Sequence, residues 1–397
     1  MTLVLYDDAR ARQFEPFALT RPAGELRAGA ELIRRRWARA SRVTATGFVG
    51  APHLAAFEEF DAPAAVSGTL AAGTIIANAR CAIALDAALG DRAQQWICDG
   101  RVAAVRLSAP LESSRLADGT LDLAALAAGT SADVRGWWLD DVWDLTRKLS
   151  VMLAADIAVL AAGVDDAPSH VAVLGEYGAH VERGAYIEPY VLFDTTEGAV
   201  LVRRGARVAA FTRLVGPCVI GEDVQVGGGK VKNCSIGEHS RVHGEISGTI
   251  FIGHTNKGHD GFVGDSVLGR WVNLGASTIT SNLKNSYGEV SLWTPAGVRR
   301  TGLTFIGSYI GDHAKLGIGT RLTTGTVVGA GANIFGSEMP PKFVPPFAWG
   351  DAPPFKEFDA EKFLEVAERV MARRSVRLGE NGRRTLSAAW ARRAEFT

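Results

Sequence analysis

The sequence predicts an α/β layered N-terminal domain followed by a parallel β-helix, and two observations support this fold class. A six-residue repeat, with an aliphatic residue first and a small residue fifth, runs through the C-terminal half from Val202 to Asn333. Neither the 3.6-residue period of a helix nor the two-residue period of a strand produces such a repeat. The first 140 residues lack the repeat and instead combine short apolar runs with an amphipathic segment. The two halves of the chain are therefore expected to form two different architectures.

The repeat is clearest in two runs. The aliphatic positions are Val202, Val208, Leu214, Ile220 and Val226 in the first run, and Ile310, Leu316, Leu322, Val328 and Ile334 in the second. Three hexads, roughly eighteen residues, form one triangular coil in which aliphatic side chains stack inside and small residues turn the corners. A β-sandwich with glycine turns is the alternative, but sandwich turns do not keep a fixed period.

We expect four segments along the chain. They are an α/β domain over 1–140, a connector helix and linker over 141–180, a left-handed parallel β-helix over 181–336, and a proline-rich strap with a C-terminal helix over 337–397. The connector helix spans 141–162 and ends at Gly163. The last helix begins at Asp359, which is suited to cap its N-terminus.

Within the N-terminal domain, the apolar run 3–6 predicts a buried strand that ends at Asp7 and Asp8. Apolar residues at helical spacing from Leu26 to Trp37 predict an amphipathic helix. Further strands are expected at 43–46, 64–67 and 73–78, and a hairpin at 95–98 and 102–105, turning at Asp99-Gly100.

Two stretches interrupt the hexad repeat, at 253–262 and 284–304. We interpret both as loops extruded from the solenoid, because the coils on either side of a loop can still stack. Loops of this kind often carry function.

Composition excludes several functions. Lys+Arg and Asp+Glu both number 43, so the formal net charge is zero and nothing favours binding to nucleic acid or to a membrane surface. The sequence shows no targeting segment and no apolar stretch long enough to span a bilayer, so we expect a cytoplasmic protein. The cysteines lack metal-site spacing, and we expect reduced packing residues at Cys81, Cys98, Cys218 and Cys234.

The interrupted region carries a family resemblance. The run His259-Asp260-Gly261-Phe262-Val263-Gly264-Asp265 precedes a coil from Leu268 to Asn282 that contains Asn273-Leu274-Gly275-Ala276. This stretch resembles the acetyltransferase half of the bifunctional N-acetylglucosamine-1-phosphate uridylyltransferase/glucosamine-1-phosphate acetyltransferase (GlmU-like) family. Leu19 to Pro22 and Glu25 to Arg27 resemble a divergent two-domain branch of that family.

The resemblance implies acetyl transfer from acetyl-CoA to the 2-amino group of glucosamine 1-phosphate, a step toward UDP-N-acetylglucosamine. His259 is then the general base that removes a proton from the ammonium, because histidine titrates near neutrality. The backbone N–H of Ala276 would stabilise the oxyanion, and Asn273 and Asn282 would hold the sugar and the new amide. The alternatives are a loop histidine that bonds only to its neighbours, and an asparagine ladder with a structural role at Asn273.

The sequence departs from the family in its acceptor pocket. Phe262 stands where the family has a tyrosine, and Ser247-Gly248 stands where the family has two lysines for the sugar phosphate. Another amino sugar could therefore be the acceptor. Substitute cations for the phosphate are available at Lys230, Lys232, Lys257 and Lys284.

The N-terminal domain departs further, because residues 3–12 lack the glycine-rich phosphate loop of the family. The branch motif suggests Mg²⁺ at Asp7 and Asp8, and UTP phosphates at Arg21 and Arg27. The alternative is that the aspartate only caps a helix and the arginines are only solvated, in a domain that has lost its activity. Two further functions stay open: nucleotidyl transfer alone, or an inactive sugar-nucleotide-binding regulatory module with a structural solenoid.

We also expect a homotrimer. A single solenoid offers flat faces, whereas acetyl-CoA needs a groove for its pantetheine arm. In the resembling family three solenoids pack around a threefold axis. The 253–262 loop holds few apolar residues, so we expect a neighbouring subunit to support it and to complete the site.

Overall fold

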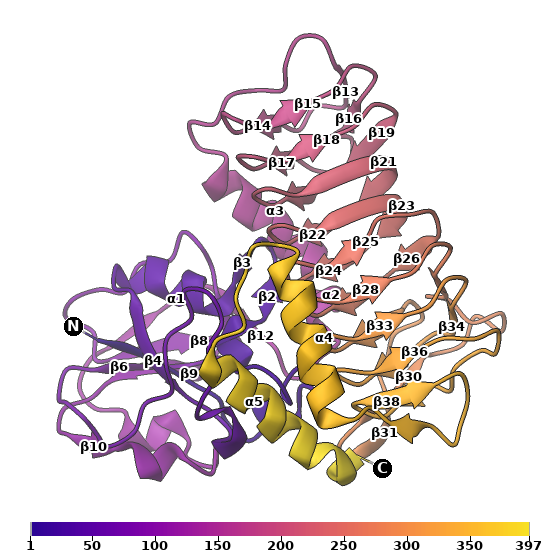
Figure 1. Cartoon of the computed structure of the whole chain (residues 1–397). Coiled ribbons are helices and arrows are strands. Elements are labelled where there is room, and N and C mark those ends of the chain that lie inside the picture. The colour runs from indigo at the N-terminus through magenta and orange to yellow at the C-terminus, as the bar shows by residue number, and fades with distance from the viewer. Residues whose placement is uncertain (1, 397) are drawn as a thin grey trace.

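The computed structural model describes residues 2–396 and contains an α/β domain packed against a long parallel β-solenoid (Figure 1). The predicted fold class is confirmed in both halves. The N-terminal sheet has six strands in the order β11-β8-β9-β6-β1-β4, and β1 pairs in parallel with both β4 and β6. These strands are β1 (Leu3–Tyr6), β4 (Ala45–Val49), β6 (Ile75–Asn78), β8 (Gln95–Cys98), β9 (Arg101–Arg106) and β11 (Ser131–Asp133).

Smaller elements surround this sheet. The short strand pairs are β2 (Arg27–Ala28) with β3 (Glu31–Leu32), β5 (Thr69–Leu70) with β10 (Leu111–Glu112), and β7 (Cys81–Ile83) with β12 (Gly136–Trp138). Short 3-10 helices lie at Ala11–Gln13, Ala23–Glu25, Pro52–Leu54, Ser113–Leu116 and Leu123–Leu126, and a last one at Arg392–Phe396 follows the C-terminal helix.

The helix expected from Leu26 to Trp37 forms only in its second half, as α1 (Ile33–Ser41). Gly29 has φ +61 and turns the chain, so residues before Ile33 pair as β2 and β3 instead. The hairpin around Asp99-Gly100 is confirmed, with both turn residues at positive φ.

Each solenoid coil contributes short strands to three faces. The first face contains β14 (Ala179–Val181), β17 (Val200–Val202), β20 (Cys218–Ile220), β22 (Ser235–Ile236), β24 (Ile250–Phe251), β27 (Val267–Leu268), β32 (Ser308–Ile310), β35 (Thr326–Val328) and β37 (Phe343–Val344).

The long strands β21 (Gln225–Lys232) and β23 (Arg241–Ser247) turn a corner and join the other two faces. The second face contains their first halves with β15 (Tyr186–Ile187), β18 (Arg207–Val208), β25 (Asn256–Lys257), β28 (Asn273–Leu274), β33 (Lys315–Leu316), β36 (Asn333–Ile334) and β38 (Ala348–Gly350). The third face contains their second halves with β13 (Ala172–Leu174), β16 (Leu192–Asp194), β19 (Thr212–Val215), β26 (Phe262–Gly264), β29 (Ile279–Thr280) and β34 (Arg321–Leu322).

The first expected extruded loop, 253–262, is not extruded, and that prediction was wrong. The segment forms a regular coil in which β25 pairs with β23 and β28. Lys257 stands opposite Val242, at the position that aliphatic residues fill in other coils, and only 1% of it is exposed. A lysine at this inward position hid the hexad from the sequence pattern.

The second expected loop, 284–304, does leave the solenoid. It forms an antiparallel hairpin of β30 (Ser291–Thr294) and β31 (Gly297–Arg300) between β29 and β32. Val290 and Leu292 are fully buried and hold the hairpin to the protein core.

The connector forms two helices, α2 (Asp144–Arg147) and α3 (Leu149–Leu160), and ends before Gly163 as predicted. Beyond the solenoid, β39 (Lys356–Glu357) pairs with β38, and Asp359 caps α4 (Ala360–Ala372) by accepting from the N–H of Lys362 at 3.0 Å. A further helix that the sequence pattern did not indicate, α5 (Glu380–Ala391), follows it. Figure 1 shows α4 and α5 between the two halves of the molecule, with α4 beside the solenoid.

The first face of the solenoid packs against the N-terminal domain. Outward side chains of this face, including Val219, Ile250 and Tyr309, belong to the same apolar core as Leu153 and Ile157 of α3. The two halves therefore form one continuous body. None of the helices within residues 2–396 combines the length and apolar character needed to cross a bilayer.

Candidate active sites

The N-terminal domain has a cleft of about 650 Å³ at the carboxyl ends of β1 and β6. This edge of an open parallel sheet is where ligands of α/β proteins bind. Residues that line the cleft include Asp8, Arg10, Asn78, Arg80, Arg101 and Trp138.

Asp8 lies in the cleft and has several partners. Its carboxylate accepts hydrogen bonds from Arg80 Nη2 at 2.7 Å and from Asn78 Nδ2 at 2.9 Å, and it accepts from the N–H of Ala11 at 2.9 Å. Burial favours the neutral acid, but these bonds and the Arg80 charge lower the pKa of Asp8 below its usual value. Asp8 is therefore an ionised carboxylate that orients Arg80 and also caps the first 3-10 helix.

Asp7 points away from the cleft. It is 3% exposed, and its Oδ2 accepts from the N–H of Ala23 at 3.0 Å. Burial raises its pKa to about 7. The two aspartates expected to share Mg²⁺ thus face different surroundings, and no group of three or more metal-ligating side chains occurs within residues 2–396. Since Arg80 and Asn78 already occupy the Asp8 carboxylate, these residues do not form a divalent-cation site by themselves.

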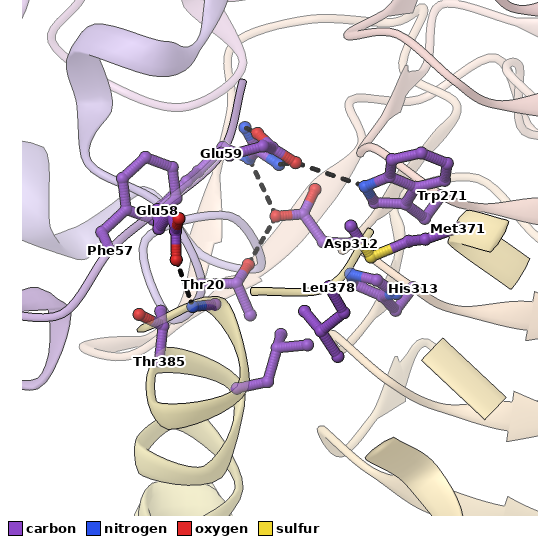
Figure 2. A pocket seen from close by; sticks show the side chains of 13 residues that line it. Thr20, Phe57, Glu58, Glu59, Trp271, Asp312, His313, Met371, Leu378 and Thr385 are labelled. Carbon is purple, nitrogen blue, oxygen red and sulfur yellow. Dashed lines mark hydrogen bonds and ion pairs between the residues drawn. The ribbon is translucent and has the colours of Figure 1, made fainter. Parts of the chain in front are cut away.

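Arg21 and Arg27 lie at the junction of the two domains rather than in the cleft. Arg21 donates to Asp312 at 2.8 Å and to Glu59 at 2.8 Å, and Arg27 pairs with Glu238. Figure 2 shows Thr20 and Glu59 of the N-terminal domain facing Asp312 and Trp271 of the solenoid. Both guanidinium groups are buried and bound to carboxylates, so they are neither phosphate ligands in the cleft nor solvated side chains.

His259 lies at the corner between the second and third faces. Asp260 O accepts from the N–H of Ser277 at 3.1 Å, which places His259 and Ala276 at the same corner of successive coils. The His259 side chain is exposed, and its imidazole has no hydrogen-bond or ion-pair partner within residues 2–396. Ala276 O accepts from the N–H of Gly319 at 2.8 Å, whereas the Ala276 N–H has no acceptor in that part of the chain. The corner therefore presents a base and a backbone donor to a ligand.

Phe262 and Asn282 lie together on the third face, which begins at this corner. A Cβ added to Gly264 would lie 2.4 Å from the Phe262 ring and 2.9 Å from Asn282 Nδ2, so both side chains flank this glycine. Asn282 Nδ2 donates to Asp265 Oδ2 at 2.6 Å. This hydrogen bond fixes the amide and leaves its oxygen as an acceptor.

Lys257 is not available to a substrate phosphate, contrary to the sequence hypothesis. Its side chain points into the solenoid core, where Nζ donates to His243 O at 3.1 Å and to His259 O. Burial lowers its pKa to about 8. Lys257 contacts the histidine corner from inside and is a positioning residue.

The other candidate cations are distributed over the surface. Lys230 lies on the third face and pairs with Glu245 at 3.5 Å, and Glu245 stands opposite Phe262 on the next strand. Lys232 pairs with Glu197 at 2.6 Å, and Lys284 donates to Glu289 O. Lys230 and Lys232 both belong to the third face, and Lys230 is the one in register with Phe262 through Glu245.

Asn273 occupies the second face, away from Phe262 and Asn282. Its Oδ1 accepts from Asn256 Nδ2 at 2.8 Å, so the asparagine ladder proposed as an alternative is present.

Sequence reasoning missed the arginines of the N-terminal cleft. Arg80 bridges Asp8 and Asp140, with Nη1 at 2.9 Å from Asp140 Oδ1, and Arg101 also contacts Asp140 at 3.0 Å. One signal was available, because the predicted strand 73–78 ends with Asn78, is followed by Arg80, and ends at the same sheet edge as β1.

Comparisons with known proteins agree with the division of the chain into an N-terminal α/β domain and a C-terminal solenoid. Residues 3–165 match the family model described as sugar nucleotidyl transferase. The bifunctional protein GlmU of Paracoccus denitrificans is 30% identical over 53% of this chain and 39% of its own length. GlmU of Bartonella quintana is 28% identical over 52% of this chain and 40% of its own.

An uncharacterized acetyltransferase, YaiX, of Escherichia coli O6:K15:H31 is 27% identical over 37% of this chain and 66% of its own length. The chain thus spans about two-fifths of the GlmU relatives described here. Residues 3–165 form a sugar nucleotidyl transferase domain, and about half of the chain is distantly homologous to the bifunctional GlmU proteins.

Proposed function

We propose that the solenoid transfers an acetyl group from acetyl-CoA to the amino group of an amino-sugar phosphate, with glucosamine 1-phosphate as the first candidate. One observation carries this proposal. The unpartnered imidazole of His259 and the unpartnered N–H of Ala276 lie at the same corner of successive coils. Acetyl transfer needs such a base and such a donor side by side.

The proposed reaction proceeds through an acyl addition. His259 takes a proton from the sugar ammonium, and the resulting amine attacks the thioester carbonyl carbon. The carbonyl oxygen becomes an oxyanion that accepts a hydrogen bond from the Ala276 N–H. The C–S bond then breaks, CoA leaves as a thiolate, and the nitrogen loses its second proton as the amide forms. The thiolate takes up one of the two protons and the His259 imidazolium releases the other to water, so atoms and charges balance.

The side chains around the corner would select the acceptor. The Asn282 oxygen can accept from the N–H of the product amide, because its nitrogen is held by Asp265. Phe262 offers the sugar an apolar surface without a hydroxyl, and Lys230 is the cation in register with it on the same face for the phosphate.

We further propose that the N-terminal cleft binds the phosphates of UTP or a related nucleotide and transfers its nucleotidyl group to a sugar 1-phosphate. Arg10 and Arg101 line the cleft with partly exposed guanidinium groups, which suit bidentate phosphate contacts, whereas Arg80 is held in the cleft wall by Asp8 and Asp140. The sugar phosphate oxygen would attack the α-phosphorus, and pyrophosphate would leave. A divalent cation would enter with the nucleotide, since Mg²⁺ commonly binds through substrate phosphates and one or two carboxylates.

The homotrimer remains a proposal with a different basis. Residues 253–262 pack within their own coil, so they need no neighbour for support. What favours a neighbour is the exposure of the His259 corner, which offers no wall for the pantetheine arm of CoA. Sedimentation equilibrium at micromolar concentration should give a trimer. A monomer that acetylates at full rate would show that one chain holds the whole site.

The function is tested by following thiol release from acetyl-CoA with a panel of amino-sugar phosphates that includes glucosamine 1-phosphate. Release that depends on the amino sugar supports acetyl transfer, and the most reactive sugar identifies the acceptor. UTP with N-acetylglucosamine 1-phosphate tests the other half through pyrophosphate release. If neither pair reacts while UTP or acetyl-CoA still binds, the chain is a regulatory binding module instead.

A further inference from the structure

A second cavity, of about 430 Å³, lies between the second face of the solenoid and α4. Arg241, Asn273 and Lys315 line it from the solenoid, and Arg373 and Arg374 from the end of α4. None of the residues lining it within 2–396 is an aspartate or glutamate. The cavity is therefore strongly cationic.

These cations lack acidic partners. Within residues 2–396, no carboxylate lies within ion-pair distance of Arg241, Arg373, Arg374 or Lys315. Burial and the charges of Arg241 and Arg373 lower the pKa of Arg374, as expected for guanidinium groups that face one another uncompensated. The buried arginines Arg21 and Arg34 are bound to carboxylates, whereas Arg241 and Arg373 are exposed at the cavity and Arg374 is half-buried. The cluster thus carries positive charge that no carboxylate of the described residues neutralises.

The remaining polar groups also donate. Lys315 Nζ donates to Trp271 O and His313 O, both at 2.7 Å; burial lowers its pKa to about 7, and its protonated form has one further N–H for an anion. Asn273 accepts from Asn256 through its oxygen, so its NH₂ group stays free to donate. Val366 and Val370 of α4 and Trp271 add apolar wall. The volume far exceeds that of one phosphate ion.

The favourable interaction of basic residues with a helix C-terminus explains part of this pattern. It accounts for Arg373 and Arg374, which follow α4, but not for Arg241 and Lys315, which come from two different solenoid coils.

We propose that this cavity binds a small organic ligand carrying at least two phosphate charges. Its guanidinium groups would contact the phosphates, and its apolar wall would contact the organic part. The site is separate from the His259 corner, because Asn256 and Asn273 lie on the flat second face whereas His259 lies beyond the end of β25. Both CoA and a sugar nucleotide carry this chemistry.

The test is protection of individual arginines from phenylglyoxal, read by peptide mass spectrometry on the full chain. The probes are inorganic pyrophosphate, adenosine 3′,5′-bisphosphate and UDP, each at millimolar concentration. Arg207 is a matched control, since it occupies the same row of the second face, two coils from Arg241, and is exposed.

We expect at least one probe to slow modification of Arg241 and Arg373 by about fivefold or more, with Arg207 unchanged. Protection by the bisphosphate alone would identify CoA as the source, and protection by UDP alone a nucleotide. In the double variant Arg241→Ala/Arg373→Ala, the concentration of that probe needed to protect Arg374 should rise about tenfold or more. Equal modification rates with and without all three probes would overturn the proposal, whether or not the chain transfers acetyl groups.

Discussion

Replacing Lys257 by methionine should make the protein more stable and less active. Lys257 places an amine in the apolar interior of a coil, one residue from the asparagine ladder, and it holds the carbonyl oxygens of His243 and His259. Methionine has a similar volume without the charge, so it should pack in the same space. The variant loses the two hydrogen bonds that Lys257 Nζ donates to the backbone at the His259 corner.

The size of the stability gain in Lys257→Met follows from the lowered pKa of the Lys257 amine. Burial lowers the pKa of Lys257 from 10.5 to about 8, and each pH unit corresponds to about 1.4 kcal/mol. Below pH 8 the buried ammonium therefore costs about 3 kcal/mol of folding free energy. Loss of the hydrogen bonds to two carbonyls offsets about 1 to 2 kcal/mol of this in the variant. A net gain of about 1 to 2 kcal/mol is expected at pH 7.

The stability gain of Lys257→Met over wild type should fall as pH rises. The folded wild type binds its proton less tightly than the unfolded chain does, so its stability relative to the variant rises as pH increases from 8 to 10.5. Above that range lysine is neutral in both the folded and the unfolded state, so only the lost hydrogen bonds remain and the variant should be about 1 to 2 kcal/mol less stable than wild type. Urea unfolding of both proteins at pH 7 and pH 10.5 measures this difference.

The rate of acetyl transfer, in contrast to stability, should be lower in Lys257→Met than in wild type. Without the contact to His259 O, the corner moves, and displacement of a catalytic group by about 1 Å can cost about 100-fold in rate. Acetyl transfer by Lys257→Met should therefore fall by about 10- to 100-fold at pH 7. A variant that is less stable than wild type at pH 7, or that keeps the full rate, would refute this role of Lys257.

Two further predictions concern buried charges. Arg21→Ala leaves Asp312 and Glu59 without their shared guanidinium group, and should lower the free energy of unfolding by about 3 to 5 kcal/mol. The control Arg35→Ala removes a surface pair with Asp61, and should lower the free energy of unfolding by less than about 1 kcal/mol. Similar losses in both variants would argue against an ionic junction. Asp7→Asn should leave stability nearly unchanged below pH 4. Because burial raises the pKa of Asp7 to about 7, wild type should lose about 4 kcal/mol relative to the variant as pH rises from 4 to 7. A pH-independent difference would show that Asp7 is not a buried neutral acid.

The sequence pattern could predict the solenoid because its hexads are local. Each coil repeats the same inward aliphatic and the same corner, so the period is visible without knowledge of distant contacts. The pattern failed at Lys257, where one inward position carries a lysine, and the coil was mistaken for a loop. Lys257 lies 15 residues after Val242 and 17 residues before Leu274, and since neither spacing is a multiple of six, counting hexads does not place it in phase either.

The junction between the domains could not be predicted in the same way. Arg21 and Asp312 are far apart in the chain, and nothing near either residue indicates its partner. The resemblance to a branch motif suggested phosphate contacts for Arg21 and Arg27, whereas the structure shows that both hold the domains together. The cationic cavity likewise joins Arg373, at the end of α4, to Lys315 and Arg241, which lie 58 and 132 residues earlier in the chain.

The most direct measurement is the rate of thiol release from acetyl-CoA, with the preferred amino-sugar phosphate, for wild type, His259→Ala and His170→Ala. His170 is an exposed histidine of the same chain that contacts Ile187 O at 3.0 Å, far from the corner. We expect His259→Ala to lower the rate by about 100-fold or more, in line with loss of a general base, and His170→Ala to change it less than about twofold. A His259→Ala protein that is folded and transfers acetyl groups at the wild-type rate would contradict the proposed site.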